Sequence, residues 1–420
     1  MDGDQLKNNN VAETARRAKR DSFALIQMEA ALRDEALSRI ADALQEARGE
    51  ILAANRADME AAEHGGLPAP ILKRLLFDEK KLEDTLAGVR DVIRLPDPVG
   101  RVLLRRELDA DLVLTQVTCP IGVIGVIFEA RPDALVQIAS LCLKSGNAAL
   151  LKGGSEAART NRKLFEIIHK AGTEAGLPEG FLALLESREE TTEMLAQHES
   201  IDLVIPRGSN EFVRYIMDHS RIPVMGHADG ICHVYVDKGF DAAKAVPIII
   251  DSKTQYVAVR NAVETVLVHA DAADALLPLL RTALEGKGVE IREGAYGKEY
   301  LDYIVSLKVV ADIEEAIEHI NTYGSHHTDA IITEDDAAAA RFFAGVDSAG
   351  VYRNCSTRFA DGFRYGFGAE VGVSTGKLHA RGPVGLDGLV TYKYELSGNG
   401  NLVADYAEGR RAFHFKDLEV

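Results

Sequence analysis

A chain of 420 residues is too long for one ordinary hydrophobic core, so two or more domains are expected. Its composition, 46% hydrophobic and 27% charged, is that of a globular protein. The 48 Lys and Arg residues against 65 Asp and Glu give a formal charge of −17, which argues against nucleic acid or an anionic membrane as a partner because both require a basic surface.

The sequence also bears on the cellular compartment. No apolar run approaches the ~18–20 residues that a membrane helix needs, and the first ten residues lack the apolar core of a secretory signal. The cysteines show no C-x-x-C spacing, so neither a disulfide framework nor a zinc site is indicated; they are Cys119, Cys142, Cys232 and Cys355. We therefore expect a cytoplasmic protein with reduced thiols.

The N-terminal part of the chain predicts helices. Between residues 11 and 63, apolar residues recur at three- and four-residue spacing with charges between them. Pro68 and Pro70 interrupt this pattern, a further helix is predicted to about Val92, and the run L-P-D-P-V-G ends it.

A hairpin is expected next. Residues 101–118 contain two apolar segments on either side of a turn at Asp109–Asp111, which predicts a hairpin that leaves the main body. Residues 386–397 have strand-like composition (L-V-T-Y-K-Y-E-L) and could pair with it. An exposed hairpin with an apolar face often serves as an oligomer edge. The last residues, 398–420, are polar and predict no particular element.

From Gly122 onward, strands and helices alternate. The first series is predicted at 123–128, 132–143, 148–151, 156–171, 181–185, 190–197, 202–205 and 210–218. The second follows the stretch Asp251–His269 and is predicted at 263–268, 272–285, 304–310, 313–321, 329–332, 337–344 and 350–353. This alternation is typical of an α/β fold with parallel sheets covered by helices on both faces.

Three turns in the first series indicate a nucleotide site. Lys152-Gly153-Gly154-Ser155, Arg207-Gly208-Ser209 and Glu129-Ala130-Arg131-Pro132 each follow a predicted strand and precede a helix. Ligands of open parallel sheets bind beyond the carboxyl ends of the strands, and a helix start with a nearby cation and hydroxyl suits a phosphate or a ribose. A single such turn is more readily explained as an ordinary Gly/Ser turn with surface charges, whereas three at equivalent positions favour a ligand. No G-x-G-x-x-G fingerprint is present in the right place.

The segment from Asn354 to Gly385 is a second candidate site. It is rich in glycine and carries several cations, which suits a small anionic substrate better than a solvated connector. Its charged and ionisable residues are Arg358, Arg364, Glu370, Lys377, His379 and Arg381. A metal interpretation of His319, His326, His327 and Asp329 is not favoured, because their spacing matches no standard site.

Together these residues resemble the γ-glutamyl phosphate reductase (glutamate-5-semialdehyde dehydrogenase) family, a branch of the aldehyde dehydrogenase superfamily. Three blocks carry the resemblance, which covers residues 11–397. They are Val310-x5-Ala316-Ile317-x-His319-Ile320-x-x-Tyr323-Gly324-Ser325-x-His327-Thr328-Asp329-x-Ile331; Ser356-Thr357-Arg358-Phe359 through Gly368-Ala369-Glu370-Val371-Gly372 to His379-Ala380-Arg381-Gly382-Pro383; and Asp251-Ser252-Lys253-Thr254-Gln255 with Asn261-Ala262-Val263-Glu264-Thr265.

The resemblance implies an aldehyde dehydrogenase-like fold with two Rossmann-like parallel-sheet α/β domains and a small β oligomerisation arm. The implied boundaries are an NADP(H)-binding domain at 1–100 and 120–236, a catalytic domain at 237–385, the arm at 101–119 and 386–397, and a C-terminal tail at 398–420. The implied reaction is NADPH-dependent reduction of L-glutamyl 5-phosphate to L-glutamate 5-semialdehyde and phosphate, the second step of proline biosynthesis from glutamate.

The resemblance also implies site residues and partners. Cofactor-binding residues would be Lys152, Gly153, Ser155, Gly208, Ser209 and, at the nicotinamide ribose, Glu299. Substrate-binding residues would be Arg131, Arg358, His379 and Arg381, with Asn261 and Glu370 in the catalytic group and no metal. A homo-oligomer and a functional association with glutamate 5-kinase would follow.

The sequence departs from the family at its nucleophile. Members read roughly P-x-V-C-N-A, whereas this chain reads Val257-Ala258-Val259-Arg260-Asn261-Ala262. In the family that cysteine attacks the acyl phosphate, and the resulting thioester accepts hydride. A guanidinium with a pKa above ~12 cannot act as a nucleophile at neutral pH. The covalent route is therefore not available at residue 260.

Four explanations are compatible with this departure: a non-catalytic paralogue that binds nucleotide or substrate, an engineered change or sequence error, substitution by another thiol, or direct hydride transfer to the acyl phosphate. Cys355, beside the second candidate site, is the surrogate thiol under the third explanation, whereas Cys119, Cys142 and Cys232 lie in strand or helix patterns and are expected in the core. Because Val257 has changed as well as residue 260, the sequence favours a re-tasked site over a lone engineered knockout.

Overall fold

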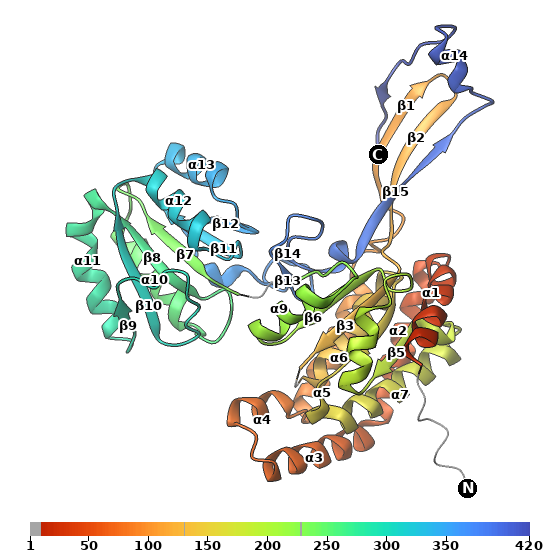
Figure 1. Cartoon of the computed structure of the whole chain (residues 1–420), viewed down its shortest axis with the longest axis horizontal. Helices are drawn as coiled ribbons and strands as arrows, with labels where there is room; N and C mark the ends of the chain where they lie inside the picture. The colour runs from red at the N-terminus through yellow and green to blue at the C-terminus, as the bar shows by residue number, and fades with distance from the viewer. Residues whose placement is uncertain (1–9, 130, 227–228) are drawn as a thin grey trace. The chain divides into compact units, whose positions relative to one another are not determined.

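The computed structural model describes residues 10–129, 131–226 and 229–420, and these form two compact units. Unit 1 comprises residues up to 208, 215–225 and 385–420, and unit 2 comprises residues 209–214 and 226–384. Each unit is built on its own parallel sheet (Figure 1). No described helix is long and apolar enough to cross a membrane.

Unit 1 contains a four-stranded parallel sheet in the order β5-β4-β3-β6. The strands are β3 (Val123–Phe128), β4 (Ala148–Lys152), β5 (Leu182–Leu185) and β6 (Leu203–Arg207). Almost every residue of these strands is buried, as their continuous apolar runs predict for strands that are covered on both faces.

Helices surround this sheet. They are α1 (Val11–Ile26), α2 (Ala30–Glu46), α3 (Arg48–His64), α4 (Ala69–Leu75), α5 (Glu79–Arg94), α6 (Pro132–Lys144), α7 (Ala158–Glu174), α8 (Arg188–Leu195) and α9 (Asn210–His219). Helices α1, α6 and α7 contact the strands directly. Pro132 lies in the first turn of α6, where its missing N–H leaves no hydrogen bond unmade.

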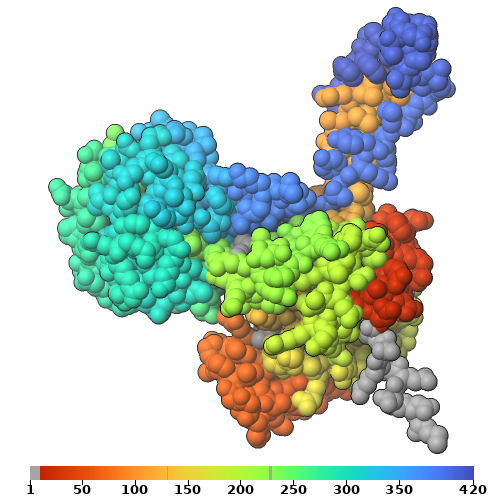
Figure 2. Space-filling model, in the orientation of Figure 1, coloured from red at the N-terminus to blue at the C-terminus, as the bar shows by residue number. Residues whose placement is uncertain are grey.

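The predicted hairpin is present as β1 (Val102–Asp109) and β2 (Leu112–Pro120). Strand β15 (Val390–Ser397) pairs antiparallel with β2 along its whole length, as the sequence suggested (Figure 2, orange and blue). The C-terminal residues are a correction to the sequence prediction. They form α14 (Val403–Ala407) and β16 (Lys416–Asp417), and β16 pairs with β1.

Aromatic stacking explains why the C-terminal residues fold. The rings of Tyr406 and Phe413 stack with centroids 4.3 Å apart, and Phe413 stacks on Phe415 at 5.3 Å. The Tyr406 hydroxyl donates to Asp109 at the hairpin turn. The hydrogen bond to Asp109 joins distant parts of the chain, so local polarity did not reveal it.

Unit 2 contains a six-stranded parallel sheet in the order β12-β11-β7-β8-β10-β9. Its strands are β7 (Cys232–Val236), β8 (Val263–His269), β9 (Glu290–Arg292), β10 (Ile304–Val310), β11 (Thr328–Ile332) and β12 (Gly350–Arg353). The sequence analysis missed β7 and β9, and it recognised only the end of α10 (Ala242–Thr254).

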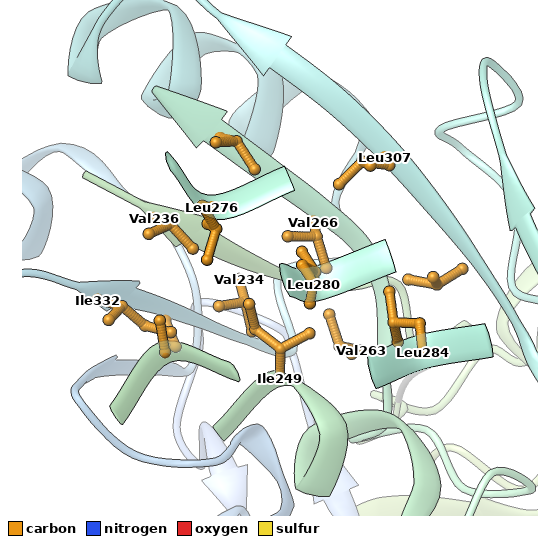
Figure 3. Packing of buried hydrophobic residues seen from close by; sticks show 14 of the residues in the cluster. Val234, Val236, Ile249, Val263, Val266, Leu276, Leu280, Leu284, Leu307 and Ile332 are labelled. Carbon is orange, nitrogen blue, oxygen red and sulfur yellow. The ribbon is translucent and has the colours of Figure 1, made fainter. Parts of the chain in front are cut away.

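Alternation along the strands builds two cores in unit 2. Val234 and Val236 of β7 lie in one cluster with Ile249 of α10 and with α11 (Ala270–Glu285) (Figure 3). Tyr235 between them lies in the other cluster, with α12 (Ile313–Tyr323) and α13 (Asp336–Gly345). Successive side chains of a strand point to opposite faces, so helices cover both sides of this sheet.

Candidate functional site

Two of the predicted nucleotide turns lie beside the central strand of the unit 1 sheet. Ile127 of β3 is paired with Lys152 of β4, and Phe128 of β3 is paired with Arg207 of β6. The turns that follow these strands therefore leave the sheet at the same carboxyl edge. This is the edge at which open parallel sheets bind their ligands.

The turn after β4 holds a buried cation. Lys152 is 8% exposed, and its ammonium donates to the Gly153 carbonyl at 2.7 Å. Burial lowers the pKa of Lys152, and the nearby Glu156 carboxylate acts in the opposite direction. A cation fixed in this way at a strand end suits a ribose hydroxyl or a phosphate oxygen.

The chain itself explains the two glycines of this turn. A Cβ on Gly153 would lie 2.2 Å from the Asn161 amide nitrogen of α7, and a Cβ on Gly154 would lie 2.0 Å from a Glu156 carboxylate oxygen. Both glycines therefore permit the turn to pack against its own helix. Ser155 then begins a short 3-10 segment that leads into α7.

The other predicted unit 1 residues lie at neighbouring strand ends. Arg131 precedes α6, is exposed, and pairs with Asp133 at 3.3 Å. Gly208 and Ser209 separate β6 from the first residue of α9, Asn210. Ala130, quoted with the first turn, lies outside the described residues.

In unit 2, the turn before β8 is hydrogen-bonded to the start of the Asn354–Gly385 segment. Ser252 accepts from the Thr357 amide at 3.2 Å, and the Thr357 hydroxyl donates to the Asn261 carbonyl at 2.7 Å. The Asn261 side chain donates to the Ala360 carbonyl at 2.8 Å, which leaves its buried carbonyl oxygen without a hydrogen bond in the described residues. Two segments about 100 residues apart in sequence are thus joined.

Arg358 extends this junction. Its Nε donates to the Gln255 side chain at 2.9 Å, and its own carbonyl accepts from Arg364 at 2.7 Å. Burial and the neighbouring Arg364 charge both lower the pKa of Arg358. The sequence-predicted residues Arg358 and Asn261 are therefore brought to one place, with Gln255 as a partner that sequence reasoning quoted but did not assign.

Arg260 lies in a charged network. Its Nη2 donates to the side-chain Oδ1 of Asn210 at 2.8 Å. The Asn210 amide donates to Asp229 at 2.9 Å and to Glu299. Glu299 also accepts from the Gly230 amide at 3.0 Å. One asparagine thus joins the predicted residues Arg260 and Glu299.

Asn210 and Asp229 were missed by sequence reasoning. The only local signal was the position of Asn210 at a helix start directly after Gly208-Ser209. A Cβ on Gly230 would lie 2.2 Å from the Arg260 carbonyl oxygen, so the two backbones approach closely. This contact explains a glycine that the sequence alone left without a role.

A buried ion pair flanks the turn that carries Arg260. Lys253, in the last turn of α10, donates to Glu264 of β8 at 2.9 Å, and both side chains are fully buried. Burial raises the pKa of Glu264 to about 7, against the lowering effect of Lys253. Glu264 also accepts from the Leu301 amide at 3.3 Å. The pair joins the two ends of the turn and was another omission of the sequence analysis.

The remaining predicted substrate residues lie farther along the same segment. Glu370 accepts from the Gly362 amide at 2.8 Å. Arg381 donates to Asp347 at 3.0 Å, and Lys377 pairs with the same carboxylate at 2.6 Å. Both cations lower the pKa of Asp347. His379 is exposed.

Of the residues weighed as metal ligands, His319 and Asp329 lie buried beside His233, which the sequence analysis did not single out, whereas His326 is half-buried and contacts the Asp347 carbonyl instead. His233 pairs with Asp329 at 3.0 Å, and its ring lies 5.6 Å from that of His319. Burial, together with nearby positive charge, lowers the pKa of His319 to about 4. Within residues 10–129, 131–226 and 229–420, no group of three or more His, Cys, Asp or Glu side chains is placed to hold a metal ion.

The cysteines differ in their surroundings. Cys142 and Cys232 are buried, as predicted, and the Cys232 thiol donates to the Arg260 carbonyl at 3.3 Å. Cys119 is partly exposed on β2, so its assignment to the core was wrong. Burial raises the pKa of the half-buried Cys355 thiol. A raised pKa reduces the thiolate fraction, which does not favour Cys355 as a surrogate nucleophile.

Known proteins are similar to this chain along most of its length. The model of the aldehyde dehydrogenase family matches residues 2–292. A γ-glutamyl phosphate reductase of Pelotomaculum thermopropionicum is 58% identical over 97% of this chain and 98% of its own length, and that of Acetivibrio thermocellus is 56% identical over 96% and 97%. The crystal structure of the γ-glutamyl phosphate reductase of Thermotoga maritima has a TM-score of 0.91 and 38% identity, and covers 93% of this chain and 99% of that one.

Proposed function

We propose that this chain, which belongs to the aldehyde dehydrogenase family and within it to the γ-glutamyl phosphate reductases, is an oxidoreductase of proline biosynthesis. Its reaction is the NADPH-dependent reduction of L-glutamyl 5-phosphate to L-glutamate 5-semialdehyde and phosphate. The observation that carries the proposal is the end-to-end similarity to relatives that bear this name.

The residues of unit 1 fit a dinucleotide, which supplies the hydride when it is bound. A buried cation, Lys152, and the helix start at Ser155 lie at the carboxyl edge of the sheet. A pocket of about 790 Å³ adjoins this turn and is lined in part by Ser155, Glu156 and Glu129. That volume lies within the usual ~300–1,000 Å³ range of cofactor sites. Gly208 and Ser209 would contribute at the start of α9.

The residues of unit 2 would bind the acyl phosphate. Arg358 and Arg381 supply positive charge for a substrate that carries carboxylate and phosphate groups. The hydrogen bonds between the turn at Ser252–Asn261 and the segment at Thr357–Ala360 fix Arg358 and Asn261 relative to each other. His379 and Glu370 complete the proposed set.

Arg260 stands at the family's nucleophile position in this proposal, so the chemistry must proceed without a thioester at residue 260. The acyl phosphate is already activated: its carbonyl carbon accepts hydride, and the bond to phosphate breaks to leave the aldehyde and inorganic phosphate. Arg260 itself cannot attack the substrate, because its guanidinium stays protonated. Its hydrogen bond to Asn210 holds it in place.

A second candidate is a non-catalytic binder of nucleotide or substrate, such as a regulatory partner of glutamate 5-kinase. The observation that favours it is the network in which Asn210 joins Arg260 to Asp229 and Glu299. In this network Glu299, the residue assigned to the nicotinamide ribose, is already engaged by Asn210 and the Gly230 amide.

The test is the reverse reaction, the phosphate-dependent and NADP-linked oxidation of glutamate semialdehyde, measured on the natural sequence, Arg260→Cys and Cys355→Ala. Direct hydride transfer predicts turnover by the natural sequence that Cys355→Ala leaves intact. No turnover by the natural sequence, with turnover by Arg260→Cys, would favour the binder. Loss of the natural activity in Cys355→Ala would instead assign the chemistry to that thiol.

The proposal extends to assembly and compartment. A homo-oligomer is supported by the edge strand β15, on which Tyr392, Tyr394 and Leu396 are 51–60% exposed. Four cysteines without disulfides fit a reducing cytoplasm. Light scattering coupled to size-exclusion chromatography tests the first point, and co-elution with glutamate 5-kinase tests the association with that enzyme. A monomeric mass would reject the oligomer.

A further inference from the structure

The pocket beside the turn after β4 has a floor made by helices outside the nucleotide turns. Its lining residues come mainly from α3, α4, the turn after β4 and the start of α7. Ala62 of α3, Leu75 of α4 and Ala157 before α7 are buried together, with Met59, Leu67 and Leu72 packed around them. Apolar side chains therefore pack beneath the pocket, and Ala62 and Leu67 of this cluster also line it.

Three arginines line this pocket from the helices. Arg74 comes from α4, and Arg159 and Arg162 come from α7. Arg162 uses Nε and Nη2 on Glu186, at 2.9 and 2.8 Å. Arg159 uses Nη1 on the Ala57 carbonyl at 3.1 Å, and the same atom lies 3.5 Å from the Asp58 carboxylate. In the described part of the chain, no hydrogen bond or ion pair engages the Arg74 guanidinium. Each guanidinium has five N–H donors, so all three retain donors for a ligand.

The carboxylates of the pocket are tied to other groups. Asp58 is 3% exposed and accepts from the Thr160 amide at 2.8 Å, from its hydroxyl at 2.7 Å and from the Arg159 amide at 3.3 Å. Asp58 therefore accepts the hydrogen bonds of backbone amides in the first turn of α7. Because these amides are occupied, an anion in the pocket must be held by side chains. Glu156 lies against Gly154 and acts electrostatically on Lys152.

We propose that this pocket receives the adenosine ribose of the dinucleotide and that Arg74, Arg159 and Arg162 hold its 2′-phosphate, which selects NADP(H) over NAD(H). A phosphate monoester matches guanidinium groups in charge and geometry. An unphosphorylated ribose offers only hydroxyls, which bind the carboxylates near the strand ends, Glu129 and Glu156. That the ligand is a dinucleotide rests on the proposed function. The three arginines that would distinguish NADP(H) from NAD(H) are assigned because they line the pocket.

The test is calorimetric binding of three adenosine phosphates to the full chain: 2′,5′-ADP, 3′,5′-ADP and 5′-AMP. Native protein should bind 2′,5′-ADP at least about 10-fold more tightly than the other two. Arg74→Gln and Arg162→Gln should each weaken 2′,5′-ADP about 3- to 10-fold and leave 5′-AMP unchanged, since each removes one phosphate contact. Raising the salt concentration should reduce the preference, because these arginines are largely exposed.

The matched control is Lys170→Gln on α7, since Lys170 is exposed and pairs with Glu174 away from the pocket. Its affinities should equal those of the native protein. Equal binding of 2′,5′-ADP and 5′-AMP, equal binding of the 2′- and 3′-phosphates, or an undiminished preference in both arginine variants would overturn the assignment. Thermal melts of each variant show that the fold is retained.

Failure of this inference is distinguishable from failure of the proposed function. Binding of the adenosine phosphates needs neither acyl phosphate nor turnover. If the protein prefers 2′,5′-ADP but has no reductase activity, the assignment of the arginines to the 2′-phosphate stands and the proposed function is wrong. If reductase activity is equal with NADPH and NADH, and the three adenosine phosphates bind equally, the role assigned to the arginines is wrong and the reductase function stands.

Discussion

The buried pair of Lys253 and Glu264 gives the sharpest prediction for stability. Both side chains are fully buried, and the ammonium and carboxylate lie 2.9 Å apart. Removing one partner of such a pair leaves an uncompensated charge and typically costs about 3–5 kcal/mol. We expect Lys253→Met to lower the free energy of unfolding of unit 2 by this amount, and its melting temperature by about 6–20 °C.

The pH dependence tests the same reasoning. Burial raises the pKa of Glu264 from 4.5 to about 7, so between these values the folded state binds a proton that the unfolded state has released. The contribution of Glu264 to stability is therefore fully present below pH about 4.5 and is lost as the pH rises to about 7. Without Lys253 that pKa rises further, so the penalty of Lys253→Met should be larger at pH 8.5 than at pH 6.

The assay is urea denaturation followed by far-ultraviolet circular dichroism, because the chain contains no tryptophan. The double variant Lys253→Met/Glu264→Leu removes both charges, and its free energy of unfolding should lie within about 1 kcal/mol of that of the native protein. Lys244→Met is the control on the same helix, since its pair with Glu334 is about half exposed and is worth about 0–1 kcal/mol. A single variant within about 1 kcal/mol of the native protein, or a double variant worse than the single, would refute this reasoning.

Three further predictions concern the sites. Asn210→Ala removes the amide that joins Arg260, Asp229 and Glu299, and should cost about 1–2 kcal/mol in urea denaturation; an unchanged midpoint would show that the network is not cohesive. Asp58→Ala removes the buried acceptor for the first turn of α7 and should lower the free energy of unfolding by about 2–3 kcal/mol. An unchanged free energy of unfolding would rule out this capping role. Gly153→Ala places a Cβ 2.2 Å from Asn161 and should weaken nucleotide binding and stability, whereas Gly88→Ala in α5, with no atom within 4 Å, should add about 0.5–1 kcal/mol; similar melting temperatures for these two would contradict the packing argument.

Much of the fold follows from local pattern. Continuous apolar runs such as Val123–Phe128, with Gly- and Pro-containing turns between them, predicted both parallel sheets and the arm hairpin. The omissions have a common cause. Strand β7 begins with Cys-His, and His233 is buried only because Asp329, 96 residues away, pairs with it. The sequence analysis assigned no element to this segment, and the partner that accommodates its buried histidine is not visible in sequence.

The candidate site divides in the same way. Lys152, Arg358 and Asn261 were predicted from motifs, and the structure places each in a buried hydrogen-bonded position. Asn210 was not predicted, because its role depends on bringing Arg260 and Glu299 within reach of one side-chain amide. Tertiary hydrogen bonds of this kind have no periodicity or spacing by which a sequence could reveal them.

The central claim is that this chain retains the reductase scaffold while residue 260 forms no covalent intermediate. The most direct measurement is intact-protein mass after the chain is mixed with glutamate semialdehyde and NADP⁺ without phosphate and quenched in acid. A thiol at residue 260 would add to the aldehyde and, after loss of hydride, remain as an acyl thioester. We predict an acylated mass for Arg260→Cys and none for the natural sequence. An acylated natural chain, or an unmodified Arg260→Cys variant, would contradict the account.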